Sequence, residues 1–188
     1  MLLGGKVILA NAVPAEQKMM SEVLKRAGFQ VVAETNNMSQ TFRRARALFC
    51  DLVIVDSALE GGKGWKTASV IEEDQLAAVL ILVSRDISLQ ERRFHYLIKP
   101  VFAENLIPAV EAALMYWQRQ LDLREKIMKL EDRLETRIIL DKAKGTLIDT
   151  LGISENEAHR FIQKEAMKRG ISLKQVASEV LKNHIPDN

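Results

Sequence analysis

Short apolar runs alternate with amphipathic segments along the first hundred residues. Several runs are apolar throughout, as expected for strands that are covered on both faces of a parallel sheet. Between the first two runs, Met20, Val23 and Leu24 have helical spacing. Gly28 then provides a typical helix stop. This alternation predicts an α/β fold with a doubly wound parallel sheet over residues 1–103. The expected strands are residues 6–10, 31–34, 51–55, 78–83 and 95–99.

A second pattern begins near residue 104. Residues 104–136 contain no glycine, and Pro108 is their only proline, so we expect one helix of about 50 Å. Apolar residues in its second half recur with 4-3-4 spacing over about two heptads, which is typical of a coiled-coil seam. This face either packs on its own domain or forms a parallel or antiparallel dimer. We favour the dimer, because the seam extends past the expected α/β domain. Its residues are Leu123, Ile127, Leu130 and Leu134.

Residues 137–188 have the pattern of a small three-helix all-α module. Glycines at 152 and 170 separate the apolar stretches and predict helix ends. Two capping boxes, one beginning at Ser154 and one at Ser172, predict the starts of the second and third helices. The expected core faces are Leu140, Ala143, Leu147 and Leu151; Ala158, Phe161, Ile162 and Ala166; and Leu173, Val176, Ala177, Val180 and Leu181.

Composition narrows the classes of function. A hydrophobic fraction of 47% over 188 residues is enough for packed cores, and a net charge of +2 gives no overall basic field. Any nucleic-acid site must therefore be a local patch. The N-terminus lacks a signal-peptide pattern, and no apolar run approaches the roughly 18 residues of a membrane span. We expect a cytoplasmic protein with no membrane partner.

Polar residues lie where the expected strands end. Asp56 follows the third strand, Ser84 follows the fourth, and Lys99 ends the fifth, which also contains Tyr96. Ligands bind at such carboxyl ends in open α/β sheets. Residues 6 to 115 thereby resemble the receiver domain of bacterial two-component response regulators, a flavodoxin-like fold. The resemblance implies that Asp56 accepts a phosphoryl group, that Ser84 and Lys99 hold its oxygens, and that Tyr96 reports the change.

The first domain departs from this pattern where receivers carry an acidic pair, after the first strand. Asn11 and Ala12 stand there instead. Phosphoryl transfer to a carboxylate gathers negative charge that Mg²⁺ neutralises, and Mg²⁺ prefers carboxylate ligands. We therefore expect a degenerate receiver without a metal or other cofactor, in which Asp56 is a weak phosphoacceptor that caps the adjacent turn or pairs with Lys99. The interval from Ser84 to Lys99 is also short for a full fourth helix.

The tail resembles the ANTAR family of RNA-binding transcription antitermination regulators. The resemblance covers residues 137–181, and His159 departs from it, since an aromatic residue is usual there. It implies binding to hairpins in nascent leader mRNA, which prevents a terminator from forming. The family's usual order of receiver, coiled coil and ANTAR module is the order found here. The matching positions are Arg137, Ala143-Lys144-Gly145, Gly152, Glu157-Ala158, Ala166-Met167, Arg169 and Val176-Ala177.

The residues themselves offer a basic stripe in support. Arg160, Lys164 and Lys168 recur every four residues and share one face of the second helix. Such a stripe either contacts phosphates and loop bases or is simply a solvated face. Glycine within a helix costs roughly 1 kcal/mol, so Gly145 indicates a close approach by a neighbouring helix or by RNA. With Phe161 expected in the core, we expect little base stacking. The predicted RNA-binding set is Arg137, Lys144, Gly145, Arg160, Lys164, Lys168, Arg169 and Lys174.

Two other functions fit parts of the pattern. A DNA-binding response regulator would read a groove with residues 172–183, which offer only Lys174 and Lys182 as cations. A protein-interaction adaptor would use the coiled coil to dock a partner. We expect no enzyme, because the sequence shows neither metal-ligand spacing nor a nucleophile with its base nor a phosphate-binding loop. The favoured interpretation is a homodimer that binds structured RNA and is controlled by a regulatory protein partner.

Overall fold

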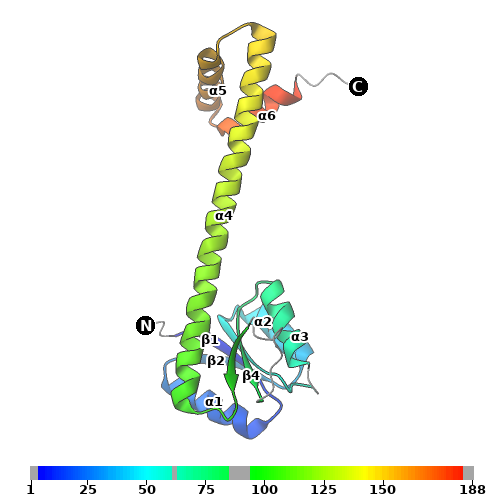
Figure 1. Ribbon diagram of the computed structural model, residues 1–188, viewed down its shortest axis with the longest axis vertical. Coiled ribbons are helices and arrows are strands. Elements are labelled where there is room, and N and C mark those ends of the chain that lie inside the picture. The colour runs from blue at the N-terminus through cyan, green and yellow to red at the C-terminus, as the bar shows by residue number, and fades with distance from the viewer. Residues whose placement is uncertain (1–3, 61–62, 85–93, 184–188) are drawn as a thin grey trace. The chain divides into compact units, whose positions relative to one another are not determined.

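A computed structural model describes residues 4–60, 63–84 and 94–183 (Figure 1). The chain divides into two compact units, Met1–Leu121 and Asp122–Asn188. The N-terminal unit contains β1 (Lys6–Ala10), α1 (Pro14–Arg26), β2 (Gln30–Thr35), α2 (Met38–Leu48), β3 (Leu52–Asp56), α3 (Gly64–Glu73), β4 (Ala78–Val83), β5 (His95–Ile98) and the first part of α4 (Ala103–Leu151). The C-terminal unit contains the rest of α4, α5 (Glu155–Arg169) and α6 (Leu173–Lys182).

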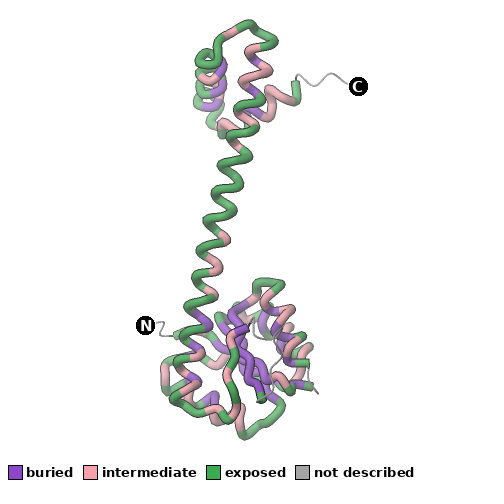
Figure 2. Tube along the Cα trace, viewed as in Figure 1, coloured by how far each residue is buried: buried purple, intermediate pink, exposed green. Residues whose placement is uncertain are grey.

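The strands form one parallel sheet in the order β2-β1-β3-β4-β5. The predicted α/β doubly wound fold is confirmed, and each expected strand lies within one residue of its predicted bounds at either end. Every residue of β3 and β4 is buried, which explains why these runs are apolar throughout (Figure 2).

Helices cover both faces of this sheet (Figure 1). On one face α1 and the first part of α4 pack through Met20, Leu24 and Leu106. On the other face α2 and α3 pack through Ala45, Ala68 and Ile71. These two cores fix the strand ends, and therefore the residues that follow them. Residues 85–93 lie outside the described ranges, so the expected shortening of the fourth helix between Ser84 and Lys99 stays a prediction.

The long helix differs from the expected pattern. We expected a helix over 104–136 and three short helices after it, but α4 runs for 49 residues, from Ala103 to Leu151, without a break. No strong helix-breaking signal lies near residue 136, and the helix ends only at Gly152, whose φ of 66° is left-handed. The first expected short helix is thus the end of α4.

The C-terminal unit has its own small core. Ala143 and Leu147 of α4 pack with Ala158 and Ile162 of α5 and with Val176 of α6. Both predicted capping boxes are present, with Ser154 accepting from the Glu157 backbone N–H and Ser172 from that of Gln175.

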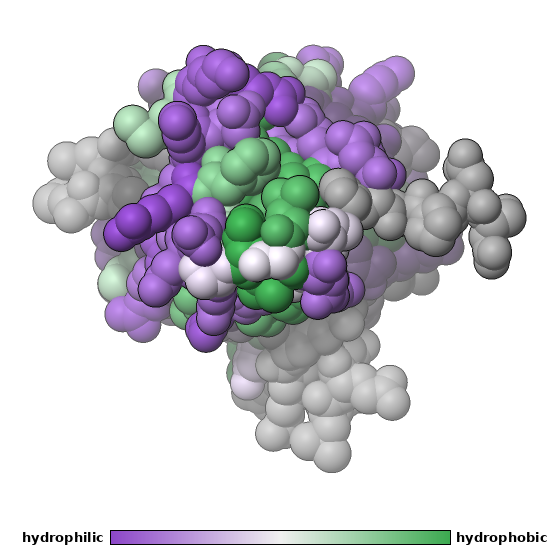
Figure 3. Space-filling model, turned by 90° about the horizontal axis from the view of Figure 1, so that it is seen from above, coloured by the Kyte–Doolittle hydropathy of each residue, from purple (hydrophilic) through white to green (hydrophobic). Residues whose placement is uncertain are grey.

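Two residues of the expected core faces do not lie in this core. Leu151 is 57% exposed and Phe161 is 43% exposed. Small residues at 158 and 166 make the buried face of α5 narrow, so Phe161, at its edge, remains in contact with solvent. Seen from above, hydrophobic side chains gather in one place within a mainly hydrophilic surface (Figure 3). Across the described ranges, no helix is both long and apolar enough to cross a membrane.

Candidate functional site

Two of the polar residues at the strand ends, Asp56 and Lys99, meet in one polar cluster of the N-terminal unit, the receiver pocket. Asp56 is the last residue of β3 and is 2% exposed, and Lys99 directly follows β5. The Lys99 ammonium donates a hydrogen bond to Asp56 Oδ2 at 2.6 Å. The Ala58 backbone N–H donates to Asp56 Oδ1 at 2.9 Å. Both alternatives that the sequence suggested for Asp56, capping of the adjacent turn and pairing with Lys99, are therefore present together.

Glu16 joins the same pocket, although the sequence pattern did not single it out. It lies in the first turn of α1, and its Oε2 accepts from Lys99 Nζ at 2.7 Å. The Asn11 amide donates to the same oxygen at 3.0 Å, while Asn11 Oδ1 accepts from the Val13 N–H at 2.7 Å. The available signal was a carboxylate in the first turn of the helix that follows the first strand, since α1 begins only four residues after β1 ends.

The pKa shifts show that the network favours its charged forms. Burial alone would lower the pKa of Lys99, but the hydrogen bonds to Asp56 and Glu16 raise it above its ordinary value. Burial alone would likewise raise the pKa of Glu16. Its hydrogen bonds from Lys99 and Asn11 lower it instead. The lysine therefore stays cationic and shares its charge between two carboxylates.

This donor set does not fit magnesium. Two carboxylates enter the pocket, and the ammonium group of Lys99 contacts one oxygen of each. Asn11 uses both of its polar atoms within the network. Magnesium requires several oxygen ligands in octahedral arrangement, so it would have to displace Lys99 from both acids. Among the described residues, no group of three or more His, Cys, Asp or Glu side chains could hold a metal ion.

The remaining receiver residues lie outside the Asp56–Lys99–Glu16 network. Ser84 directly follows β4 and is exposed, and Tyr96 in β5 is 39% exposed. Gly64, at the start of α3, lies against the pocket from another side. A Cβ added to it would lie 2.0 Å from the Asp56 backbone oxygen. Only a residue without a side chain allows α3 to approach β3 this closely.

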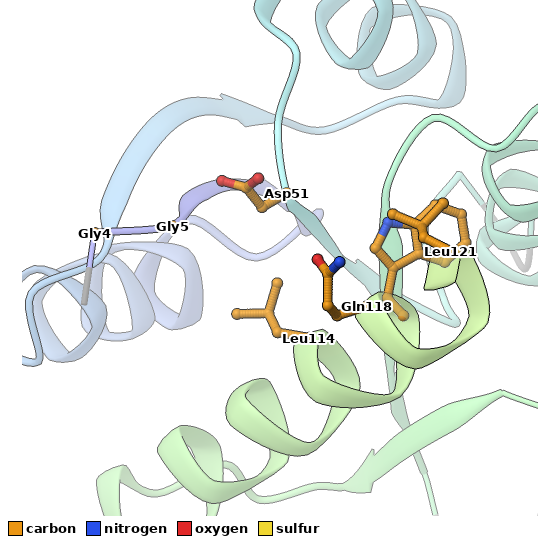
Figure 4. A pocket seen from close by; sticks show the side chains of 7 residues that line it. Gly4, Gly5, Asp51, Leu114, Gln118 and Leu121 are labelled. Atoms are coloured by element: carbon orange, nitrogen blue, oxygen red, sulfur yellow. The ribbon is translucent and has the colours of Figure 1, made fainter. Parts of the chain in front are cut away.

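The opposite end of the sheet contains a cavity of about 330 Å³ (Figure 4). Asp51 lies at its edge, and its Oδ2 accepts from the Lys6 backbone N–H at 2.7 Å. The carboxylate thus joins the start of β3 to the start of β1, and its hydrogen bond is made within the sheet. The cavity is lined by Gly4, Gly5, Asp51, Leu114, Trp117, Gln118 and Leu121.

In the C-terminal unit, three cations of the predicted RNA-binding set are engaged by carboxylates. Lys144 contacts Asp141 at 2.9 Å and Glu155 at 2.7 Å, and so joins α4 to α5. Lys174 of α6 contacts two acids of α4, Asp132 and Glu135, at 2.8 Å each. These pairs hold the three helices together.

Arg169 is the third of these engaged cations. Its two terminal nitrogens donate to the two carboxylate oxygens of Glu179, one of them at 2.9 Å. This bidentate pair joins the end of α5 to α6 and raises the pKa of Arg169 above its ordinary value, with the hydrogen bonds as the main cause. A ligand phosphate would have to replace the carboxylate at this position.

The basic stripe on α5, formed by Arg160, Lys164 and Lys168, differs from these three paired cations. Arg160 and Lys164 are exposed, and within the described part of the chain no carboxylate oxygen lies within 4 Å of either cationic group. Lys168, 72% exposed, has only a distant partner in Glu165 at 3.8 Å, and Arg137 has one in Asp141 at 3.9 Å.

Gly145 is half-buried but has open space where a side chain would lie, and the seam residues are exposed. Among the described residues, a Cβ on Gly145 would meet nothing within 4 Å, so packing against one of the described helices does not explain the glycine. The four seam residues, Leu123, Ile127, Leu130 and Leu134, are between 51% and 61% exposed.

Comparison with known proteins gives these two sites a context. Residues 7–111 match the response regulator receiver domain, and residues 128–181 match the ANTAR domain. The chain is 31% identical to the transcriptional regulatory protein PdtaR of Mycobacterium tuberculosis over 182 residues, covering 94% of this chain and 89% of that protein. The aliphatic amidase regulator of Pseudomonas aeruginosa is 29% identical over 85 residues, which cover 45% of this chain and 43% of that protein.

Solved structures support the fold of the N-terminal unit. The signal receiver domain of a modulated diguanylate cyclase from Desulfovibrio desulfuricans matches with a TM-score of 0.55 and 21% identity, covering 62% of this chain and 98% of that chain. The receiver domain of a LuxO repressor protein from Vibrio parahaemolyticus matches with a TM-score of 0.56 and 18% identity, covering 65% and 98%. Together with the sequence relatives, these matches show that the chain belongs to the response regulators in which a receiver domain is followed by an ANTAR domain.

Proposed function

We propose that this response regulator acts by transcription antitermination, and that its C-terminal unit binds hairpins in nascent leader mRNA. The observation that carries the proposal is the exposure of Arg160 and Lys164 on α5, neither of which forms an ion pair with a residue that the structure describes. By their names, the two relatives are a transcriptional regulatory protein and an aliphatic amidase regulator, which agrees with this class of function.

The cations of the module have two different roles in this proposal. Arg160, Lys164 and Lys168 are available to phosphates, because binding there displaces counterions and breaks at most one weak pair. Lys144, Arg169 and Lys174 would each have to leave a carboxylate first. We therefore assign the first three to RNA contact and the second three mainly to holding α4, α5 and α6 together.

The proposed active form is a homodimer through the seam. Four large apolar side chains on one face of α4 remain half exposed, and burial of each in a knobs-into-holes interface is favourable. A dimer would carry two modules, so a leader with two hairpins would gain affinity through the effective concentration of the second.

We further propose that the receiver is degenerate and serves as a regulatory or partner-docking domain. Lys99 already compensates the charge of Asp56 and Glu16, which is the task of a metal in phosphoryl transfer. Regulation would then come from a protein partner. In intact mass spectrometry after incubation with a small phosphodonor and Mg²⁺, we expect no stoichiometric phosphoryl adduct. An adduct that disappears in Asp56→Asn would refute the degenerate receiver.

RNA binding is tested by titrating the full chain with an RNA hairpin and a DNA hairpin of matched sequence at one salt concentration. We expect tighter binding to RNA, and the Arg160→Ala/Lys164→Ala variant should reduce the slope of log K against log salt by about 2. A matched control is Lys126→Ala/Arg133→Ala, which removes the same charge from exposed positions on α4 outside the predicted set. Equal binding of both hairpins, or equal slopes in both variants, would exclude the proposed site.

A further inference from the structure

The exposed face of α5 combines its cations with two large apolar side chains. Phe161 is 43% exposed and Met167 is 85% exposed. Phe161 belongs neither to the core of the C-terminal unit nor to the partly buried residues packed against it. A free helix face normally carries charged and polar residues, so two large apolar side chains beside a basic stripe are together a candidate binding feature.

The order of side chains around α5 supplies one. At about 100° per residue, Arg160, Lys164 and Lys168 span about 80° of the helix surface. Phe161 lies about 20° beyond Lys168, and Met167 about 20° beyond Arg160 on the other side. The basic stripe is therefore flanked by one apolar side chain on each edge, within a single face about 120° wide.

The positive charge of this face of α5 favours RNA over a protein as the binding partner. A protein partner that covered Phe161 and Met167 would also bury Arg160 and Lys164, which have no carboxylate partner among the described residues. A strand of RNA offers what both kinds of side chain need, because its phosphates are anionic and its unpaired bases have apolar faces.

We propose that Phe161 is a stacking platform for an unpaired base in the loop of the bound RNA hairpin, with Arg160 and Lys164 holding the phosphates on either side of that base. The inference rests on the proposed RNA binding and adds a residue and a mode of readout to it. It also revises the expectation from sequence, in which Phe161 was a core residue and stacking was weak. Met167, on the other edge of the stripe, borders an open cavity of about 540 Å³ beside the α5–α6 turn.

The mode of contact predicts how affinity depends on the residue at position 161. Base–aromatic stacking contributes about 1–3 kcal/mol per base, so Phe161→Leu should weaken hairpin binding about tenfold. Phe161→Trp keeps an aromatic face and should bind at least as tightly as the natural chain. The salt slope should not change in either variant, because neither removes a charge.

The experiment uses full-length protein and a hairpin whose loop bases are replaced one at a time by the fluorescent base 2-aminopurine. Stacking on an aromatic ring quenches this base, so we expect one loop position to be quenched on binding by the natural chain and by Phe161→Trp, but not by Phe161→Leu. Phe102→Leu is the control, because Phe102 is also exposed, at 56%, and lies in the N-terminal unit. Circular dichroism melting checks that the substitutions leave the helices folded.

The outcomes separate this inference from the proposed function. Retained affinity and quenching in Phe161→Leu, with binding still reduced in Arg160→Ala/Lys164→Ala, would overturn the stacking platform and leave RNA binding intact. Absence of hairpin binding by the natural chain would overturn both. A change in sedimentation mass with unchanged affinity in Phe161→Leu would place the ring in a protein contact, and this too would overturn the inference.

Discussion

Lys99 of the receiver pocket and Lys164 of the ANTAR module are both lysines that the sequence predicts to be functional, one from its place after a strand and one from the spacing of a basic stripe, but their surroundings are opposite. Lys99 is one-fifth exposed and contacts two carboxylates, one of which is almost completely buried. Lys164 is exposed and has no carboxylate partner within the described ranges. The sequence pattern shows where a charge lies, whereas burial and neighbouring groups determine whether a ligand can bind to it.

The two regions should therefore respond differently to loss of a charge. Removing one member of a buried pair leaves the other without compensation, which typically costs about 3–5 kcal/mol. Removing an exposed, unpaired cation changes stability by less than about 0.5 kcal/mol, although it can weaken binding strongly. The N-terminal unit thus uses its polar groups for its own structure, and the α5 face keeps its cations for a ligand.

The largest expected effect comes from Lys99→Met. It leaves Asp56, which is 2% exposed, without its ammonium partner, so unfolding of the N-terminal unit should become easier by about 3 kcal/mol near neutral pH. Urea denaturation followed by tryptophan fluorescence measures this unit selectively, because both tryptophans, Trp65 and Trp117, belong to it.

The matched control is Lys63→Met, which removes a lysine that is 61% exposed and lies 3.4 Å from Glu60. We expect it to change stability by less than about 1 kcal/mol. Equal losses in the two variants would mean that the pocket does not depend on compensation of the Asp56 charge.

The second prediction compares two glycines of the N-terminal unit, one with no room for a methyl group and one with room for it. Gly64→Ala places a Cβ 2.0 Å from the Asp56 backbone oxygen, and α3 must move away from β3. Overpacking of this kind costs about 1–3 kcal/mol, and contact with backbone argues for the upper part of that range. Denaturation curves of Gly64→Ala and of Gly5→Ala test this, because the Cβ at residue 5 would meet its neighbours at ordinary distances of 3.6 Å or more.

A destabilised Gly5→Ala together with an unaffected Gly64→Ala would contradict the close approach of α3 to β3.

Much of this fold follows from local patterns. The buried strands are apolar throughout, and Ser154 and Ser172 begin helices as their capping boxes predict. The continuity of α4 could also have been predicted, because no strong helix-breaking signal separates residues 136 and 137.

The contents of the sites depend on tertiary geometry that spacing does not encode. Glu16 reaches the pocket because of the direction in which α1 leaves β1, so a search for an acidic pair directly after the strand misses it. Phe161 has helical spacing with Ala158, but the spacing does not say how wide a face the module covers. Two features could be determined only from the structure. They are which group pairs with a given charge, and where the small core of the C-terminal unit ends.

Gly145→Ala should stabilise the protein, whereas Gly64→Ala should destabilise it. Its Cβ meets nothing within 4 Å, so the variant should gain the usual advantage of alanine within a helix, about 1 kcal/mol. If RNA approaches the backbone at this position, the same variant should bind the hairpin more weakly although it is more stable. Thermal melting by circular dichroism and hairpin titration of one preparation measure both quantities.

Ser178→Ala is the comparison for that variant, because it alters a helical residue of the same unit without filling a glycine position. Gly145→Ala with higher stability and unchanged affinity would remove Gly145 from the RNA-binding set.

The smallest expected effect concerns the acid side of the pocket. The pKa of Glu16 is lowered in the folded protein, so its charge stabilises the fold above its unfolded pKa of about 4.3 and this contribution disappears as the pH falls through the folded value. Because Glu16 is two-fifths exposed, solvent screening limits the contribution to less than about 1 kcal/mol. The pKa of Lys99 is raised, so its proton stays bound throughout this range.

Glu16→Gln should therefore be less stable than the natural chain near pH 7, and this deficit should be smaller near pH 3, when urea denaturation is followed by tryptophan fluorescence at about these two values. Glu22→Gln removes an exposed carboxylate from the same helix and should follow the natural chain at both pH values. A deficit in Glu16→Gln that is as large near pH 3 as near pH 7 would show that the shape of the side chain, rather than its charge, supports Lys99. Packing rather than charge would then hold Lys99 in place. The difference between Lys99 and the exposed cations of α5 would no longer be explained by charge compensation.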